Sequence, residues 1–140
     1  MEWIGKAKKA GAVVLTGGTR EGNVIRPTVL TNTTQDMEVN CMEVFGPVVT
    51  VVLYEDFDAV LKEVNNSAFG LQAGIFTQNI HLIHKAYQEL EVGGLIINDV
   101  PTYRIDHMPY GGVKDSGFGR EGVRYAMEEM TEPKLLVLTY

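Results

Sequence analysis

The sequence predicts an α/β fold with an open parallel sheet and flanking helices, and three observations lead to this prediction. Short apolar runs alternate with amphipathic stretches along most of the chain. Residues 48–53 form a β-branched run that is apolar on both faces, as in a central strand covered on both sides. Strand, helix, strand, helix and strand patterns then follow in order between Val48 and Ile97, which predicts two right-handed crossover units.

The first third of the chain is expected to hold one helix and two short strands. Apolar residues at helical spacing end at Gly11; they are Trp3, Ile4, Ala7 and Ala10. Residues 12–15 predict a strand that stops at the glycine pair Gly17 and Gly18. Residues 28–30 predict a second strand, and the polar residues 31–35 a loop.

Two helices are expected in the middle of the chain. Asp56 is a suitable N-cap for a helix that runs to Asn65 and Asn66; its apolar face is Phe57, Val60, Leu61 and Val64. Residues 73–76 predict the next strand. Asn79 can cap a second helix that stops at Gly93. The apolar stripe of this helix is Ile80, Ile83, Tyr87 and Leu90. Residues 95–97 predict a third strand.

The C-terminal part combines a long loop, a helix and a final strand. Residues 98–119 lack clear periodicity, and a connection of this length in a compact domain is usually functional. A helix over residues 121–129 should end before Pro133, with one apolar face formed by Val123, Ala126, Met127 and Met130. The segment from Lys134 to Tyr140 predicts a strand with no partner in its own neighbourhood, which favours pairing with another chain.

Composition excludes several classes of function. The chain has 140 residues, enough for one domain with one core, and its net charge of −6 argues against a nucleic-acid partner. No apolar stretch approaches the ~20 residues that span a bilayer. Cys41 is the single cysteine, so no internal disulfide can form and a cytoplasmic, reducing compartment is expected.

Few residues are candidates for chemistry from residue type alone. Glu43 and Phe45 place a carboxylate and a ring at the entry of the 48–53 strand, which fits either a surface carboxylate and a core ring or a nucleotide contact. The glycine-rich stretch 110–122 matches no phosphate-loop pattern and is expected to be structural. Cys41 lies beside Glu43 without a neighbouring cation, so it is not expected to be a nucleophile. The three histidines form no metal set.

Four motifs in order and at consistent spacing resemble one family. They are Glu43-Val44-Phe45-Gly46-Pro47-Val48, Asn65-Asn66-Ser67-Ala68-Phe69-Gly70-Leu71, Gly74-Ile75-Phe76-Thr77 and the stretch from Met108 to Gly122. Together the motifs resemble the C-terminal portion of the aldehyde dehydrogenase superfamily, over nearly the whole chain. The resemblance implies a partial open parallel sheet with flanking helices over residues 1–130, and an oligomerisation strand over residues 131–140.

The resemblance also implies a chemistry. Family members oxidise an aldehyde to a carboxylic acid with NAD or NADP, through a cysteine thiohemiacetal. By motif, Glu43 would bind the nicotinamide ribose and Phe45 would pack near the nicotinamide. Four residues fall near positions that line the tunnel for a small aldehyde: Val100, Tyr103, Arg104 and Tyr110. Arg104 would meet a negatively charged substrate or form an ion pair with Asp106.

The resemblance limits what the chain can do by itself. In the family, the nucleophilic cysteine, the catalytic glutamate and the cofactor domain lie upstream of the part matched here, so we expect no catalytic residue, no tightly bound cofactor and no dehydrogenase activity in the isolated chain. We expect a homo-oligomer assembled through the segment from Lys134 to Tyr140, with no nucleic-acid or membrane partner. The alternative function is a non-catalytic assembly or regulatory module with the same partial fold.

Overall fold

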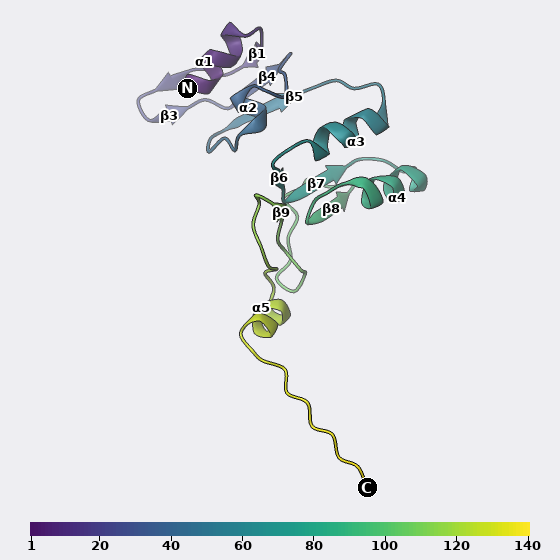
Figure 1. The fold of residues 1–140 in the computed structure, drawn as a ribbon. Helices are drawn as coiled ribbons and strands as arrows, with labels where there is room; N and C mark the ends of the chain where they lie inside the picture. Colours follow the sequence, from purple (N-terminus) through teal and green to yellow (C-terminus); the bar gives the residue numbers. More distant parts are fainter. The chain divides into compact units, whose positions relative to one another are not determined.

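The computed structural model describes residues 1–140, which form two compact units, Met1–Phe57 and Asp58–Tyr140 (Figure 1). Chain length alone predicted one core. The structure instead gives the first unit a core of its own, while very few side chains of the second unit are fully buried. None of the helices is long and apolar enough to cross a bilayer.

Unit 1 consists of two helices and five short strands. They are α1 (Glu2–Lys9), β1 (Val13–Thr16), β2 (Arg20–Glu21), β3 (Val24–Ile25), β4 (Thr28–Thr31), α2 (Glu38–Cys41) and β5 (Val48–Val51). The helix that ends near Gly11 and the strands after Ala12 and Pro27 were predicted. The β2–β3 hairpin and the single turn α2 were not, because elements this short have no periodicity.

The main sheet of unit 1 has the strand order β1-β4-β5. Strand β4 runs parallel to β5, with Thr28 opposite Val48, but β1 runs antiparallel to β4. The predicted parallel pairing therefore holds for β4 and β5, whereas β1 makes the sheet mixed. The prediction that β5 is a central strand covered on both faces was wrong, because β5 is the edge strand and Val49 is 53% exposed.

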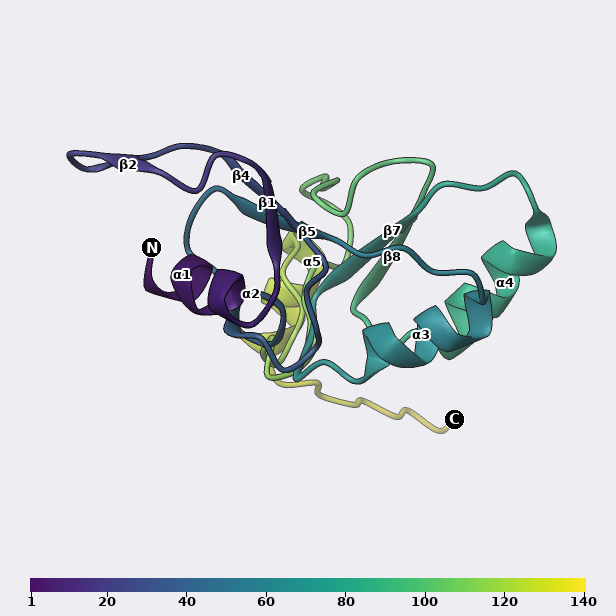
Figure 2. The same cartoon turned by 90° about the horizontal axis from the view of Figure 1, so that it is seen from above.

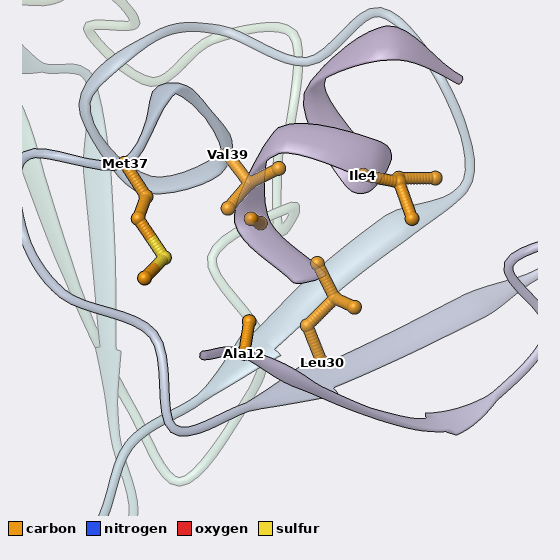
Figure 3. Packing of buried hydrophobic residues seen from close by; sticks show 6 residues of the cluster. Ile4, Ala12, Leu30, Met37 and Val39 are labelled. Atoms are coloured by element: carbon orange, nitrogen blue, oxygen red, sulfur yellow. The ribbon is translucent and has the colours of Figure 1, made fainter. Parts of the chain in front are cut away.

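The core of unit 1 lies between this sheet and the two helices (Figure 3). Leu30 is completely buried at the middle of β4, and Ile4 from α1 and Val39 from α2 are members of the same cluster. Lys6 joins the helices at their surface, since its Nζ lies 2.9 Å from a carboxylate oxygen of Glu2 and 3.0 Å from Glu38. The apolar side of α1 thus holds it on the sheet, as its spacing predicted.

Unit 2 consists of three helices and four strands, followed by an extended C-terminal segment. They are α3 (Phe57–Asn65), β6 (Phe69–Gly70), β7 (Gln72–Ile75), α4 (Ile80–Glu89), β8 (Gly94–Ile97), β9 (Val113–Lys114) and α5 (Val123–Glu129). Helices α3 and α4 lie next to each other in Figures 1 and 2, joined by an ion pair of 2.5 Å between Lys85 and Asp58.

One of the two predicted crossover units is confirmed. Strand β7 pairs in parallel with β8 and with no other strand, and α4 connects them. Asn79 caps α4 as predicted, because its side chain accepts a hydrogen bond of 3.0 Å from the backbone N–H of His81. The other predicted crossover would connect β5 through α3 to β7. Strand β5 pairs only with β4, so β5 and β7 do not lie in one sheet.

The predicted apolar faces of α4 and α5 are only partly buried. In α4 the buried residue is Ala86, while Ile80 and Tyr87 of the predicted stripe are exposed. Helix α5 starts two residues later than expected and buries no residue; Val123 and Met127 stay exposed. Hydrophobic spacing predicts a face, but a face is buried only where another element covers it.

The segment from Lys134 to Tyr140 is extended and belongs to no strand (Figure 1). Leu135 is 85% exposed and Leu138 is 66% exposed. The segment therefore pairs with none of the sheets of its own chain.

Candidate functional site

The first predicted site segment connects α2 to β5 in unit 1. Glu43 is exposed, and the ring of Phe45 is 92% exposed. The backbone turns tightly here, because Gly46 N–H donates to the carbonyl of Val44 at 2.9 Å and Val48 N–H donates to Gly46 at 2.8 Å. Both side chains are thus exposed to solvent on a short turn at the start of β5.

An apolar groove of about 220 Å³ lies beside this turn. Phe45 and Pro47 form part of its lining, and the first turn of α1 forms another part. Glu43 does not line the groove. The structure therefore places Phe45, but not Glu43, at this apolar groove.

The structure places Cys41 at the surface of unit 1. It is a free, exposed residue at the end of α2, and its Sγ lies 3.7 Å from the carbonyl oxygen of Asp36. Thr34 donates a hydrogen bond to the Asp36 carboxylate, which lowers the pKa of that carboxyl.

The second predicted site follows β8 in unit 2. Val100 and Tyr103 lie in one turn, in which Tyr103 N–H donates to the carbonyl of Val100 at 3.2 Å. The turn is attached to β7, because the Gln72 side chain donates to the Tyr103 carbonyl at 3.2 Å. Val100 is 49% exposed and Tyr103 is 45% exposed, so both side chains remain accessible from this loop.

Arg104 is held by an aromatic ring and a carboxylate. Its guanidinium carbon lies 4.4 Å from the ring centroid of Tyr110, and one of its nitrogens lies 2.6 Å from an oxygen of Glu121. Tyr110 and Glu121 also form a backbone bridge. Arg104 therefore forms an ion pair, as one of the two sequence-based interpretations predicted. The carboxylate in this pair is that of Glu121 and not that of Asp106, because the backbone bridge brings Glu121 close to the ring of Tyr110.

The glycine-rich stretch is structural, as expected, and Lys114 is its anchor. Lys114 has a positive φ of 55°, and its Nζ donates to the carbonyls of Asn65 and Ser67 and pairs with Glu91 at 2.8 Å. The Ser116 hydroxyl accepts a hydrogen bond of 3.0 Å from Gly70 N–H. Sequence reasoning missed this anchor, because its partners lie 23 to 49 residues before Lys114 in the chain.

A smaller cavity of about 190 Å³ lies within the same stretch. Tyr110, Glu121 and Arg120 line it, and Arg120 donates to the carbonyls of Gly112 and Gly119. Val100 and Tyr103 do not line this cavity. The structure therefore brings together Arg104 with Tyr110 and Val100 with Tyr103, as two neighbouring pairs along one loop.

No three His, Cys, Asp or Glu side chains are grouped as metal ligands.

Small mixed sheets with flanking helices and a long loop beyond a strand end define part of an α/β enzyme fold. The model of the aldehyde dehydrogenase family matches residues 1–136, so the chain belongs to the aldehyde dehydrogenase family.

The chain is similar to several characterised enzymes. It is 53% identical to a 3-sulfolactaldehyde dehydrogenase of Priestia megaterium, over 98% of this chain and 29% of the relative. It is 44% identical to a sulfoacetaldehyde dehydrogenase of Neptuniibacter caesariensis, over 96% of this chain and 30% of the relative. The chain thus spans less than a third of the length of these relatives.

Solved structures give the same result. Aldehyde dehydrogenase 21 of Physcomitrella patens, in complex with the reaction product succinate, is 47% identical with a TM-score of 0.95, over 98% of this chain and 28% of that chain. A glyceraldehyde-3-phosphate dehydrogenase of Methanocaldococcus jannaschii, complexed with NADP, is 39% identical with a TM-score of 0.85. The match covers 92% of this chain and 28% of that chain. The fold described above is therefore the fold of a part of these enzymes.

Proposed function

We propose that the chain is the C-terminal portion of an NAD(P)-dependent aldehyde dehydrogenase, which oxidises an aldehyde to a carboxylic acid through a cysteine thiohemiacetal. The observation that supports this most is the match of 98% of the chain, at 53% identity, to 29% of a 3-sulfolactaldehyde dehydrogenase. The nucleophilic cysteine, the catalytic glutamate and the cofactor domain would then belong to the other part of the enzyme. Cys41 does not replace the nucleophile in this proposal, because it lies two residues before Glu43, which is not the position of the nucleophile in the family.

Glu43 and Phe45 supply one side of the cofactor site in this proposal. The Glu43 carboxylate accepts hydrogen bonds from the ribose hydroxyls, and the Phe45 ring packs near the nicotinamide. The exposure of both side chains on a tight turn supports these roles. A single side of a site gives few contacts, so this chain alone does not bind NAD or NADP tightly.

The substrate we propose is a small aldehyde that has an anionic group. Val100, Tyr103 and Tyr110 line its path, and Arg104 pairs with the anionic group. The ring of Tyr110 and the carboxylate of Glu121 hold the guanidinium ready for this role. Relatives named for sulfolactaldehyde and sulfoacetaldehyde, both of which have a sulfonate, support an anionic substrate.

An activity assay tests the proposal. The purified chain is incubated with 3-sulfolactaldehyde and NAD or NADP, alone and together with a polypeptide comprising the part of the Priestia megaterium relative that this chain does not match. We expect no NADH or NADPH from the chain alone and measurable production from the mixture. Arg104→Met should raise KM for 3-sulfolactaldehyde and leave KM for uncharged lactaldehyde unchanged, while the exposed Arg124→Met serves as the control. Production of NADH by the chain alone would contradict the proposal.

A non-catalytic assembly or regulatory module remains the second candidate function, and the exposed C-terminal segment favours it. Leu135 and Val137 are 85% and 68% exposed, and such an extended apolar segment can pair with another chain. In either candidate function, self-association through the segment from Lys134 to Tyr140 is expected. Light scattering over a range of concentrations tests it, and a monomer that stays monomeric at high concentration would argue against it.

A further inference from the structure

The main chain on both sides of Arg104 is fixed by hydrogen bonds. Before it, the Gln72 side chain donates to the Tyr103 carbonyl at 3.2 Å and ties the loop to β7. After it, Met108 N–H donates to the carbonyl of Ile105 at 3.1 Å, and Ile105 N–H points at the sulfur of Met108 at 3.3 Å. The loop therefore presents the Arg104 side chain from a defined position.

The guanidinium of Arg104 is occupied at one face and at one nitrogen. Its face lies over the ring of Tyr110, with 4.4 Å between the guanidinium carbon and the ring centroid. Its single hydrogen bond in the structure runs from one terminal nitrogen to the Glu121 carboxylate at 2.6 Å. An arginine has five N–H donors arranged as a planar fork. One edge of this fork is therefore left for a second anion while Glu121 stays bound.

Glu121 is kept beside Arg104 by backbone contacts. Tyr110 N–H donates to the Glu121 carbonyl at 3.1 Å, and the two residues form a backbone bridge. The chain is tightly packed at the next position, because a Cβ at Gly122 would lie 2.8 Å from the carbonyl oxygen of Met108. The Glu121 charge is thus a built-in part of the surroundings of any anion that binds Arg104.

The charges of this pair discriminate between kinds of anion. The charges of Arg104 and Glu121 sum to zero, so an incoming anion gains hydrogen bonds from the free edge but is repelled by the carboxylate. Coulomb repulsion is proportional to the charge of the anion. A phosphate monoester, which carries nearly two negative charges above its second pKa of about 6, is therefore repelled about twice as strongly as a sulfonate or a carboxylate. The other two cations of the loop, Lys114 and Arg120, donate to backbone carbonyls.

We propose that Glu121 determines which anionic group Arg104 accepts, and that it favours a compact monoanion, a sulfonate or a carboxylate, over a phosphate dianion. This inference rests on the proposed function, since it takes Arg104 as the residue that pairs with the anionic end of the aldehyde. Glu121 acts through Arg104 and is a positioning residue. Its hydrogen bond orients the fork, and its charge selects the substrate.

Two probes of similar shape and different charge test this selection. Ethanesulfonate and ethyl phosphate both end in a tetrahedral group with three terminal oxygens, but at about pH 7.5 the second has nearly twice the charge. Each is titrated into the full 140-residue chain at constant ionic strength, and the ¹³C NMR signals of the Arg104 guanidinium and the Tyr110 ring report binding. Arg104→Met should abolish the saturable shift of the Tyr110 signals for both probes.

A matched pair of variants isolates the charge of Glu121. Glu121→Gln keeps an acceptor for Arg104 and removes the charge, so affinity should rise about threefold for ethanesulfonate and about ninefold for ethyl phosphate, because the repulsion removed is twice as large for the dianion. Glu128→Gln removes the same charge from another exposed ion pair, 2.8 Å from Arg124, and should leave the preference between the probes unchanged. Circular dichroism shows whether the fold is kept, and Glu121→Met replaces Glu121→Gln if the latter does not fold.

Each result has a defined meaning. A preference for ethanesulfonate that falls about threefold in Glu121→Gln and stays constant in Glu128→Gln supports the inference. An equal gain for both probes, or no gain, overturns it, and the proposed role of Arg104 then stands if Arg104→Met still abolishes binding. Binding that is insensitive to Arg104→Met, or absent in every variant, overturns the inference together with that role. Selective binding without NADH or NADPH in the mixed assay leaves the inference intact and removes the proposed activity instead.

Discussion

The side chain of Lys114 reaches the end of a helix that lies 49 positions earlier in the chain: its Nζ donates a hydrogen bond of 2.6 Å to the backbone carbonyl of Asn65. Asn65 in turn binds the end of α4, because its side chain donates to the carbonyl of Glu89 at 2.6 Å and accepts from Glu91 N–H at 2.8 Å. The two residues thus join α3, α4 and the glycine-rich stretch at one point.

Lys114→Met should destabilise unit 2 by about 1–3 kcal/mol, since it removes hydrogen bonds and a half-buried ion pair with Glu91. Chemical denaturation measures the loss, and hydrogen exchange should show faster exchange within residues 110–122. Lys134→Met at the exposed C-terminal segment is the control and should change neither. Equal exchange in Lys114→Met and the parent would contradict the anchoring role.

Gly93→Ala should be strongly destabilising, because a Cβ there would lie 1.7 Å from the carbonyl oxygen of Gly111. We expect a cost of about 3 kcal/mol, the upper end of overpacking effects, because both neighbouring groups are backbone. Gly5→Ala is the matched control. A Cβ at Gly5 meets no atom within 4 Å, and alanine inside α1 should stabilise by about 0.5–1 kcal/mol. Thermal unfolding of both variants provides the comparison.

Leu30→Ala should remove the centre of the unit 1 core. Leu30 has no exposed surface, so we expect a loss of about 3 kcal/mol from lost transfer free energy and the remaining cavity. Leu15→Ala on β1, where Leu15 is 61% exposed, should change stability by less than about 1 kcal/mol. Similar urea midpoints for the two variants would show that the core is not where the structure places it.

The pH dependence of stability should reflect Lys6 between Glu2 and Glu38. The hydrogen bond from Lys6 lowers the pKa of Glu2 below 4.5, so this contribution is present above that value and is lost as pH falls through the lowered pKa. The pKa of Lys6 is raised above 10.5 by hydrogen bonds to both carboxylates, so its contribution is full below that value and is lost as pH rises through the raised pKa.

Melting temperatures across this range test the effect against Lys6→Met. The parent and the variant should differ most between these limits and converge in acid. Because all three groups are at the surface, the difference should be small and should shrink in high salt. A difference that persists at pH 2 would point to lost packing instead of lost charge.

Local patterns predicted most helices of this protein well. The Asn79 cap fixed the start of α4, and the apolar spacing before Asn65 fixed α3, to within a residue, because capping and helical periodicity depend on neighbours in sequence. The end of α4 lies at Glu89, several residues before the predicted stop at Gly93. The pairing of Phe69 with Lys114 was not predictable, since two-residue strands have no pattern and their partner is remote. The predicted buried face of α4 was wrong for a related reason. Ile80 and Ala86 lie on the same helix, but the tertiary packing covers Ala86 and leaves Ile80 exposed.

The sequence by itself determined the family, through motifs whose order and spacing are specific, and with it the candidate residues Glu43, Phe45 and Arg104. Only the tertiary structure decided what surrounds them. It paired Arg104 with Glu121 through the backbone bridge to Tyr110, and it left Phe45 almost fully exposed beside an apolar groove. The physical reason is that partners, grooves and exposed edges depend on which segments, distant in sequence, meet in the fold.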